Sequence, residues 1–165
     1  DLARLQLSRS NHCECNTHRN FSSGITMKSY YGKCACGNAE YSITLPQDLS
    51  CYTPRACDCD FCTSRKVEYL SDSAGRIEIR SVLPLQRLKQ GSNQATFLSC
   101  PTCATILGVA YITDKVSVGA VNATCLVDKA ALQPAISASP KQLTAEEKVA
   151  RWLMLWSSLK ITEHG

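Results

Sequence analysis

The chain has 165 residues, with 18 Lys and Arg against 14 Asp and Glu, and a formal net charge of +4. This length is sufficient for one domain with a hydrophobic core. The charge is mild and no block of Lys and Arg alternates with aromatic residues, which argues against nucleic-acid binding. The longest apolar run, Ile106 to Ile112, is too short to span a bilayer, so no membrane association is expected.

Eleven cysteines are the unusual feature of the composition. A small secreted protein held by disulfides typically has an even number of scattered cysteines, whereas here the number is odd and the cysteines form tight clusters. A disulfide across a Cys-x-Cys pair would also be strained. The pattern therefore favours metal binding over a disulfide framework, and with it a reducing, cytoplasmic location.

Residues 1–26 differ from the rest of the chain because they are polar and lack a sustained hydrophobic pattern. Met27 followed by Lys28 is typical of a native start, so the preceding segment is interpreted as a leader or an appended tail. It contains four metal-ligand residue types, which we interpret as an accidental cluster because nothing nearby indicates fixed geometry. These residues are His12, Cys13, Cys15 and His18.

From Tyr30 onward the pattern predicts strands. Residues 39–45 alternate apolar and polar side chains, as expected for a half-buried strand, and Gly37 and Asn38 mark the turn before it. Short strand-like runs follow at residues 67–70, 75–80, 95–98, 106–112 and 115–121.

A helix is predicted near the C-terminus, where Thr144 and Glu147 form a capping box. An apolar stripe at helical spacing follows, made of Val149, Trp152, Leu153, Trp156 and Leu159. We interpret this stripe as packing against the sheet; a partner-binding helix is the alternative, because two Trp are a large apolar surface. The predicted fold is mainly β, with small antiparallel sheets and one C-terminal helix. We expect a zinc-binding domain at residues 27–130 and a C-terminal extension at 131–165, whose amphipathic helix packs on the domain.

Three cysteines, Cys57, Cys59 and Cys62, fall within six residues. In extended chain a Cys-x-Cys pair places both side chains on one face, and the following Cys-x-x-Cys step is a turn-sized return, so three sulfurs can meet at one atom. Three thiolates with an open fourth position are typical of a catalytic zinc site. Alternatively, Cys51 or Cys125 supplies a fourth sulfur and the site is structural.

Basic residues flank the three-cysteine set. Three thiolates on Zn²⁺ leave one net negative charge. Arg55, Arg65 and Lys66 could offset that charge or bind an anionic substrate. A solvated rim is the alternative interpretation.

A second set combines one Cys-x-Cys pair and one Cys-x-x-Cys pair that are far apart in the chain: Cys34, Cys36, Cys100 and Cys103. Four thiolates make a closed, redox-silent, structural zinc site, whose binding energy contributes to folding. A metal here would connect the first strand to a late one. Four ordinary buried cysteines are the alternative, but two separate pairs are difficult to explain by packing.

These motifs together resemble the glutathione-dependent formaldehyde-activating enzyme family, also called the centromere protein V family. The resemblance rests on GKCACG at 32–37, CDCDFC at 57–62 and FLSCPTC at 97–103, with a closing strand at 116–121. It covers about residues 30–125. The family has Cys-Gly after the last motif, where this chain has Cys103-Ala104.

The resemblance implies a β-tent fold with two zinc ions, a structural one at the four-cysteine set and a catalytic one at the three-cysteine set. It also implies carbon–sulfur bond chemistry, the joining of glutathione and formaldehyde to S-hydroxymethylglutathione or its reversal. We therefore expect a zinc-dependent carbon–sulfur lyase whose partner is a small-molecule thiol or a thiol–aldehyde adduct. The alternative is a non-enzymatic zinc-stabilised module that recognises a protein partner.

Overall fold

The computed structural model describes residues 27–89, 94–138 and 143–164. The interpretation of residues 1–26 as a leader or tail lies outside these ranges. So does the ligand set within that segment, His12, Cys13, Cys15 and His18.

The described part of the chain is mainly β with a C-terminal helix, which confirms the predicted fold class. Its strands are β1 (Lys28–Lys33), β2 (Ala39–Leu45), β3 (Arg55–Cys57), β4 (Glu68–Leu70), β5 (Arg76–Ser81), β6 (Gln86–Lys89), β7 (Thr96–Ser99), β8 (Ile106–Ile112), β9 (Ser117–Asn122), β10 (Ile136–Ala138) and β11 (Ser157–Glu163). Its helices are α2 (Asp60–Arg65) and α3 (Ala145–Leu155), with short 3-10 turns η2 (Leu49–Cys51), η3 (Ala123–Cys125) and η4 (Lys129–Ala131). Neither α2 nor α3 is long and apolar enough to cross a membrane.

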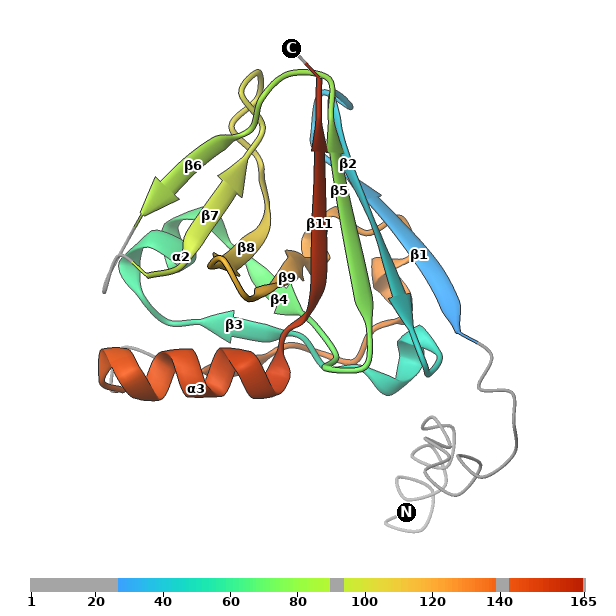
Figure 1. Ribbon diagram of the computed structural model, residues 1–165. Coiled ribbons are helices and arrows are strands. Elements are labelled where there is room, and N and C mark those ends of the chain that lie inside the picture. Colours follow the sequence, from blue (N-terminus) through green and yellow to red (C-terminus); the bar gives the residue numbers. More distant parts are fainter. Residues whose placement is uncertain (1–26, 90–93, 139–142, 165) are drawn as a thin grey trace, which may run out of the picture.

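The small antiparallel sheets expected from the sequence are joined into one mixed network. One path of neighbouring strands runs β1-β2-β5-β11-β9-β4-β3-β10, and β6, β7 and β8 join it through β9. Most neighbours are antiparallel, but β11 lies parallel to β5, and β10 lies parallel to β3. Figure 1 shows β6 and β7 on one side and β1, β2 and β5 on the other, leaning together toward the top, while α3 crosses the base.

Strand β2 shows how the alternating pattern builds the core. Ala39, Tyr41, Ile43 and Leu45 are all fully buried, and the residues between them are exposed or half-buried. The Tyr41 ring lies directly over Gly32 of the neighbouring strand, where an added Cβ would lie 2.5 Å from the ring. A side chain at position 32 would therefore displace Tyr41, which explains glycine there.

Buried side chains form two clusters. The larger one contains Tyr41, Leu98 and Leu107 and includes Cys34 and Cys100 of the four-cysteine set. The smaller one contains Tyr69, Phe97 and Trp156 and includes Cys62. Each cysteine set therefore lies at the edge of its own apolar cluster.

The predicted helix begins where expected but ends before the apolar stripe does. Thr144 is the N-cap, and Thr144 and Glu147 make both hydrogen bonds of the capping box. The helix stops at Leu155, and Leu159 lies in strand β11, so the continuation of the helix to Leu159 is wrong. The reason is tertiary: Ser157 Oγ bonds the backbone of Asp72, and β11 pairs with β5 along most of its length.

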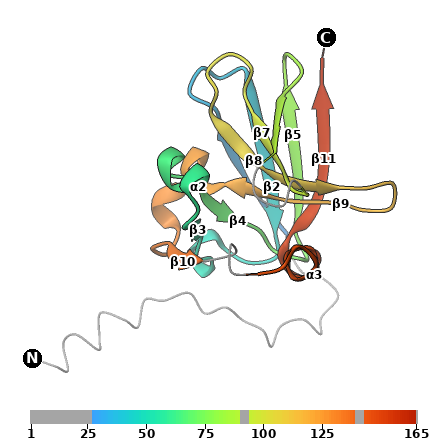
Figure 2. The same cartoon turned by 90° about the vertical axis from the view of Figure 1, so that its left-hand side faces the viewer.

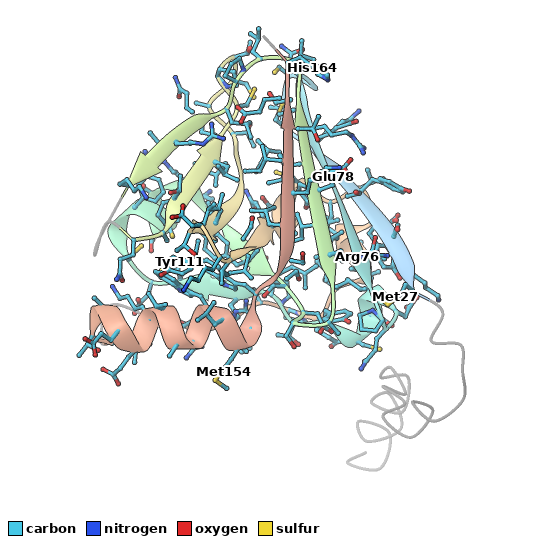
Figure 3. All side chains as sticks on the ribbon, in the orientation of Figure 1. Met27, Arg76, Glu78, Tyr111, Met154 and His164 are labelled. Carbon is cyan, nitrogen blue, oxygen red and sulfur yellow. The ribbon has the colours of Figure 1, made fainter. Side chains whose placement is uncertain are left out.

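Helix α3 contacts the sheet through aromatic rings. Trp152 stacks on Trp156 with ring centroids 4.9 Å apart and lies 5.7 Å from the ring of Tyr111. Figure 3 shows Tyr111 above the helix and Met154 on its opposite side, where Met154 is 72% exposed. No residue of the helix itself is fully buried.

Candidate metal centres

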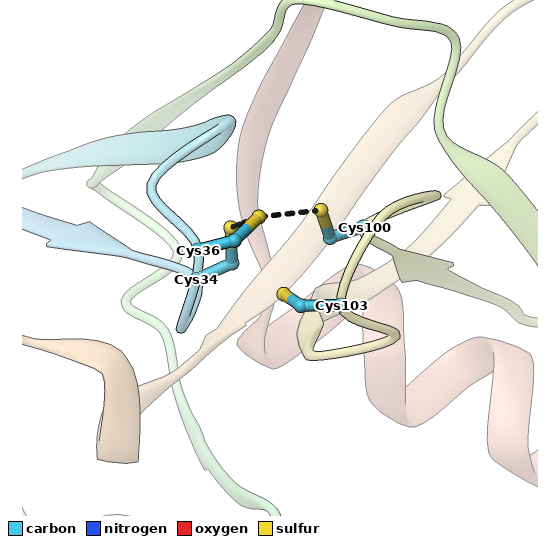
Figure 4. A group of neighbouring side chains, drawn as sticks. All are labelled: Cys34, Cys36, Cys100 and Cys103. Atoms are coloured by element: carbon cyan, nitrogen blue, oxygen red, sulfur yellow. Dashed lines mark hydrogen bonds between the residues drawn. The ribbon is translucent and has the colours of Figure 1, made fainter.

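The four-cysteine group joins two turns from distant parts of the chain. Cys34 and Cys36 follow β1, and Cys100 and Cys103 follow β7. The first turn closes through Gly37, whose φ of +83° favours glycine and whose N–H donates to the Cys34 carbonyl at 3.1 Å. Figure 4 shows the four sulfurs turned toward one another.

The spacing of these sulfurs fits a tetrahedral metal ion. All four lie within 4.8 Å of one another, and the Sγ distances are 3.5 Å for Cys34–Cys36 and 3.6 Å for Cys36–Cys100. Four thiolates bound to zinc at 2.3 Å in a tetrahedron would lie about 3.8 Å apart. The predicted set of four cysteines therefore comes together with a geometry that could hold a metal ion.

Hydrogen bonds to the sulfurs of this group stabilise the thiolate form. The Ala39 N–H donates to Cys34 Sγ at 3.4 Å, and Thr105 Oγ1 lies 3.1 Å from Cys103 Sγ. Burial opposes ionisation of Cys103, but hydrogen bonds from Thr105 and Cys36 lower its pKa to about 5. At Cys36 a backbone hydrogen bond favours the thiolate, yet burial and bonds to the neighbouring sulfurs raise its pKa to about 12. The cysteines thus share protons as a group.

The three-cysteine group is local and lies where β3 turns into α2. Cys57 ends β3, Cys59 is the N-cap of α2, and Cys62 lies in its first turn. The Cys62 N–H donates to Cys59 Sγ at 3.4 Å, and all three sulfurs lie within 4.8 Å of one another. Figure 2 shows α2 close to β3 and β4 on one side of the molecule. The sequence did not predict this short helix, but the three ligand positions converge as predicted.

A tyrosine lies against this group. Tyr69 Oη is 3.1 Å from Cys62 Sγ, and burial raises the pKa of Tyr69, so the phenol keeps its proton. The hydrogen bond with Cys62 lowers the pKa of Cys57 to about 6, and the same bond together with burial raises the pKa of Cys62. One thiolate of the group is therefore favoured near neutral pH.

Neither candidate for a fourth sulfur joins the three-cysteine group. Cys51 belongs to neither sulfur group, and Cys125 Sγ lies 3.7 Å from the Ile106 carbonyl. Burial raises the pKa of Cys125 to about 11, with smaller contributions from Cys34 and Cys103 of the other group. Among the residues that the structure describes, no fourth His, Cys, Asp or Glu completes the three-cysteine set.

The three basic residues of the sequence prediction have different surroundings. Arg55 is half-buried and lies two residues before Cys57, on the same face of β3; its Nη2 donates to Ser71 Oγ at 2.8 Å. Burial, followed by repulsion from Arg151, lowers the pKa of Arg55. No carboxylate within the described ranges forms an ion pair with it.

Arg65 and Lys66 have local roles. The Arg65 guanidinium lies 3.8 Å from the centre of the Phe61 ring and bonds the Phe61 carbonyl, so it is folded back on its own helix. Lys66 is the C-cap of α2 in the left-handed conformation, with φ of 54°. Of the three, Arg55 is best placed to face an anion beside the cysteines.

A pocket of about 460 Å³ lies away from both cysteine groups. Pro54, Glu68 and Lys129 are among its lining residues, and no cysteine is. Glu68 pairs with Ala56 in the β3–β4 register, so both face away from Cys57. This pocket is therefore not part of the candidate metal centre.

Tyr69 and Ser71 were missed at the sequence level. The run at 67–70 predicts a strand, but only the register Arg55↔Tyr69 shows that this strand lies beside the three-cysteine loop. Arg55 and Tyr69 are 14 positions apart, and pairing over that separation leaves no periodic signal in the sequence, so the phenol next to Cys62 could not be anticipated.

The comparisons with known proteins do not establish a family. No family model and no curated protein matches the chain. A solved structure of a Rhodobacter sphaeroides protein is similar over 64% of this chain and 99% of its own, with 22% identity and a TM-score of 0.46.

Proposed function

We propose that this protein is a zinc-dependent carbon–sulfur lyase of the formaldehyde-activating type, acting on a thiol–aldehyde adduct such as S-hydroxymethylglutathione. The observation that carries the proposal is the difference between the two cysteine groups. One is a closed set of four sulfurs, and the other has three sulfurs with no fourth ligand from the described residues. An incomplete protein ligand set is the mark of a catalytic zinc.

Zinc bound at the three-cysteine group would supply a Lewis acid that makes a thiol ionise near neutral pH. The chain's own part is to hold and shield the reacting groups. Cys57, Cys59 and Cys62 fix the position, and the Phe61 and Phe97 rings, 4.6 Å apart, form an apolar border beside them. In the forward reaction the substrate sulfur adds to the aldehyde carbon and one proton moves to the oxygen; the lyase direction is the reverse.

Arg55 is proposed to orient the substrate by binding its carboxylate. A half-buried guanidinium without a carboxylate partner among the described residues is electrostatically incomplete, and an anion would stabilise it. Arg151 of α3 adds to the positive potential, since its repulsion lowers the pKa of Arg55. Arg65 and Lys66 then contribute to the general potential around the site and not to a specific contact.

The experiment is the exchange rate between formaldehyde and its thiol adduct, measured by NMR exchange spectroscopy with the zinc-loaded protein. We expect faster exchange for glutathione than in buffer with free zinc alone. Cys57→Ser should abolish the acceleration, whereas Cys125→Ser, which changes a cysteine outside both groups, should keep it. Arg55→Gln should raise KM for glutathione but leave an uncharged thiol such as 2-mercaptoethanol unaffected, and Arg55→Lys should restore part of the loss. Exchange no faster than in buffer with either thiol would refute the proposal.

A non-enzymatic module that recognises a protein partner is the second candidate, and helix α3 is the observation that favours it. Leu153 is 47% exposed and Met154 is 72% exposed, next to the half-buried Trp152. The two candidates are distinguished by coordination. X-ray absorption showing three sulfurs and one oxygen at the second zinc favours the lyase, and four sulfurs favour the module.

A further inference from the structure

Within the described part of the chain, a tyrosine outside the three-cysteine loop lies within hydrogen-bond distance of this centre. Tyr69 Oη lies 3.1 Å from Cys62 Sγ, and only 8% of the Tyr69 surface is exposed. Tyr69 pairs with Arg55 in the antiparallel β3–β4 register, which places its ring on the same face as Cys57. The phenol is thus held by the sheet and not by the metal-binding loop.

Two sulfurs of the group have a backbone N–H donor. The Cys59 N–H donates to the Cys57 sulfur, and the Cys62 N–H donates to the Cys59 sulfur. Both of these come from the backbone, so the fold of the loop supplies them whatever the side chains are. The donor to Cys62 is the Tyr69 hydroxyl, which a single substitution can remove.

The direction of this bond follows from chemistry. A metal-bound cysteine is a thiolate and has no proton, so the phenol must donate. Donation draws negative charge away from sulfur and stabilises a buried anion in apolar surroundings. It also makes the sulfur a weaker nucleophile.

We propose that Tyr69 is a positioning residue that orients the Cys62 thiolate and suppresses its reaction with electrophiles. This inference rests on the proposed metal at the three-cysteine group. In a site that handles an aldehyde, the ligand sulfurs must stay intact while the substrate thiol reacts. Cys62 is 2% exposed and lies in the apolar cluster with Phe97. The hydrogen bond from the Tyr69 phenol therefore replaces the hydration that the Cys62 sulfur loses on burial.

The test uses cobalt as a spectroscopic replacement for zinc. The sulfur-to-cobalt charge-transfer band of the three-cysteine centre is obtained by subtracting the spectrum of Cys57→Ser, which retains the four-cysteine group. Tyr69→Phe should shift this band to lower energy, because a thiolate without its hydrogen bond gives up charge more easily. In the zinc-loaded protein, alkylation of Cys62 by iodoacetamide, followed by peptide mass spectrometry, should become about tenfold faster.

Two further variants control for packing. Tyr41→Phe removes another buried phenol, one that donates 2.7 Å to the Asn122 carbonyl, and should change neither the band nor the alkylation rate. Tyr69→His keeps an N–H donor and should bring the band and the rate back toward the wild type. Circular dichroism verifies folding, and the His variant carries the test by itself if the Phe variant unfolds.

The outcomes separate this inference from the proposed function. A wild-type spectrum identical to that of Cys57→Ser means that the three-cysteine group binds no metal, which removes the proposed centre. A cobalt band that is present in the wild type but unshifted in Tyr69→Phe, with unchanged alkylation of Cys62, overturns the role of Tyr69 and leaves the metal centre standing.

Discussion

At the scale of single residues, the turn after Cys103 adopts a conformation that does not suit its side chain. Ala104 has a φ of 63°, in the left-handed region, and its N–H donates 2.9 Å to the Cys100 carbonyl. An L-residue with a Cβ is disfavoured there by roughly 1–2 kcal/mol, whereas glycine is not. The position is the one at which the resembling family has glycine. The same turn is closed by the Cys100 N–H, which donates 2.9 Å to the Thr105 carbonyl.

We expect Ala104→Gly to raise the free energy of unfolding by about 1 kcal/mol, since the strain removed exceeds the added flexibility of the unfolded chain. Urea denaturation at saturating zinc measures this. Ala150→Gly, in the exposed interior of α3, is the matched control and should lower the free energy by about 1 kcal/mol. If both substitutions destabilise to the same extent, the strain at Ala104 is not real.

At the scale of elements, the last strand is tied to β6 by a carboxylate. Glu163 of β11 accepts hydrogen bonds from the Leu85 N–H at 2.6 Å and from both terminal nitrogens of Arg87. The Arg87 hydrogen bond holds the pKa of Glu163 below its usual value of 4.5. The ion pair therefore connects two strands that do not pair with each other directly.

The pH dependence of this connection follows from the sign of the shift. Because the folded pKa is lower than the unfolded one, the stabilisation is complete above about pH 4.5 and is lost as the pH falls through the folded pKa. We expect Glu163→Gln to reduce the free energy of unfolding at pH 7 by about 0.5–1 kcal/mol and to flatten its decline in acid. Chemical denaturation between pH 3 and about 7 measures both.

Glu40→Gln is the control for that measurement, because Glu40 pairs with Arg80 on the surface and the two side chains are 53% and 41% exposed. Solvent and salt screen such a pair, so its loss should have a smaller effect. An acid decline that remains unchanged in Glu163→Gln contradicts the assignment of this carboxylate.

At the scale of the whole molecule, the two cysteine groups constrain the chain to different extents. A metal in the four-cysteine group would link Cys36 to Cys100, which are 64 positions apart in the chain, at the edge of the larger apolar cluster. A metal in the three-cysteine group closes only the short turn from Cys57 to Cys62. Loop-closure entropy grows with loop length, so the first metal restrains the unfolded chain more strongly.

We therefore expect Cys36→Ser to unfold the domain and Cys59→Ser to leave it folded. By the loop-closure relation used for cross-links, the long loop contributes about 4 kcal/mol and the short one about 2 kcal/mol. Thermal unfolding followed by circular dichroism, with and without a chelator, measures the difference. Equal unfolding by the two substitutions would remove the division into a structural and a catalytic centre.

The sequence by itself determined the local features. Alternation along residues 39–45 predicted β2, and the apolar run at 106–112 predicted β8, both to the residue. Thr144 with Glu147 predicted the start of α3. These signals depend only on residues that are close together in the sequence. Likewise, the spacing in 57–62 brings three sulfurs together within a single loop. Each of these features is decided by short-range geometry.

Only the tertiary structure decided what lies beside these elements. It brought Cys34 and Cys36 to Cys100 and Cys103, placed Tyr69 against Cys62, and ended the helix at Leu155 so that β11 could join β5. Leu159 of β11 continues the helical spacing of the apolar stripe, which predicted a longer helix. Backbone pairing of β11 with β5 outweighed that local preference. Pairing between distant strands depends on their register and on the surface that they bury together. The spacing of residues along the chain predicts neither of these.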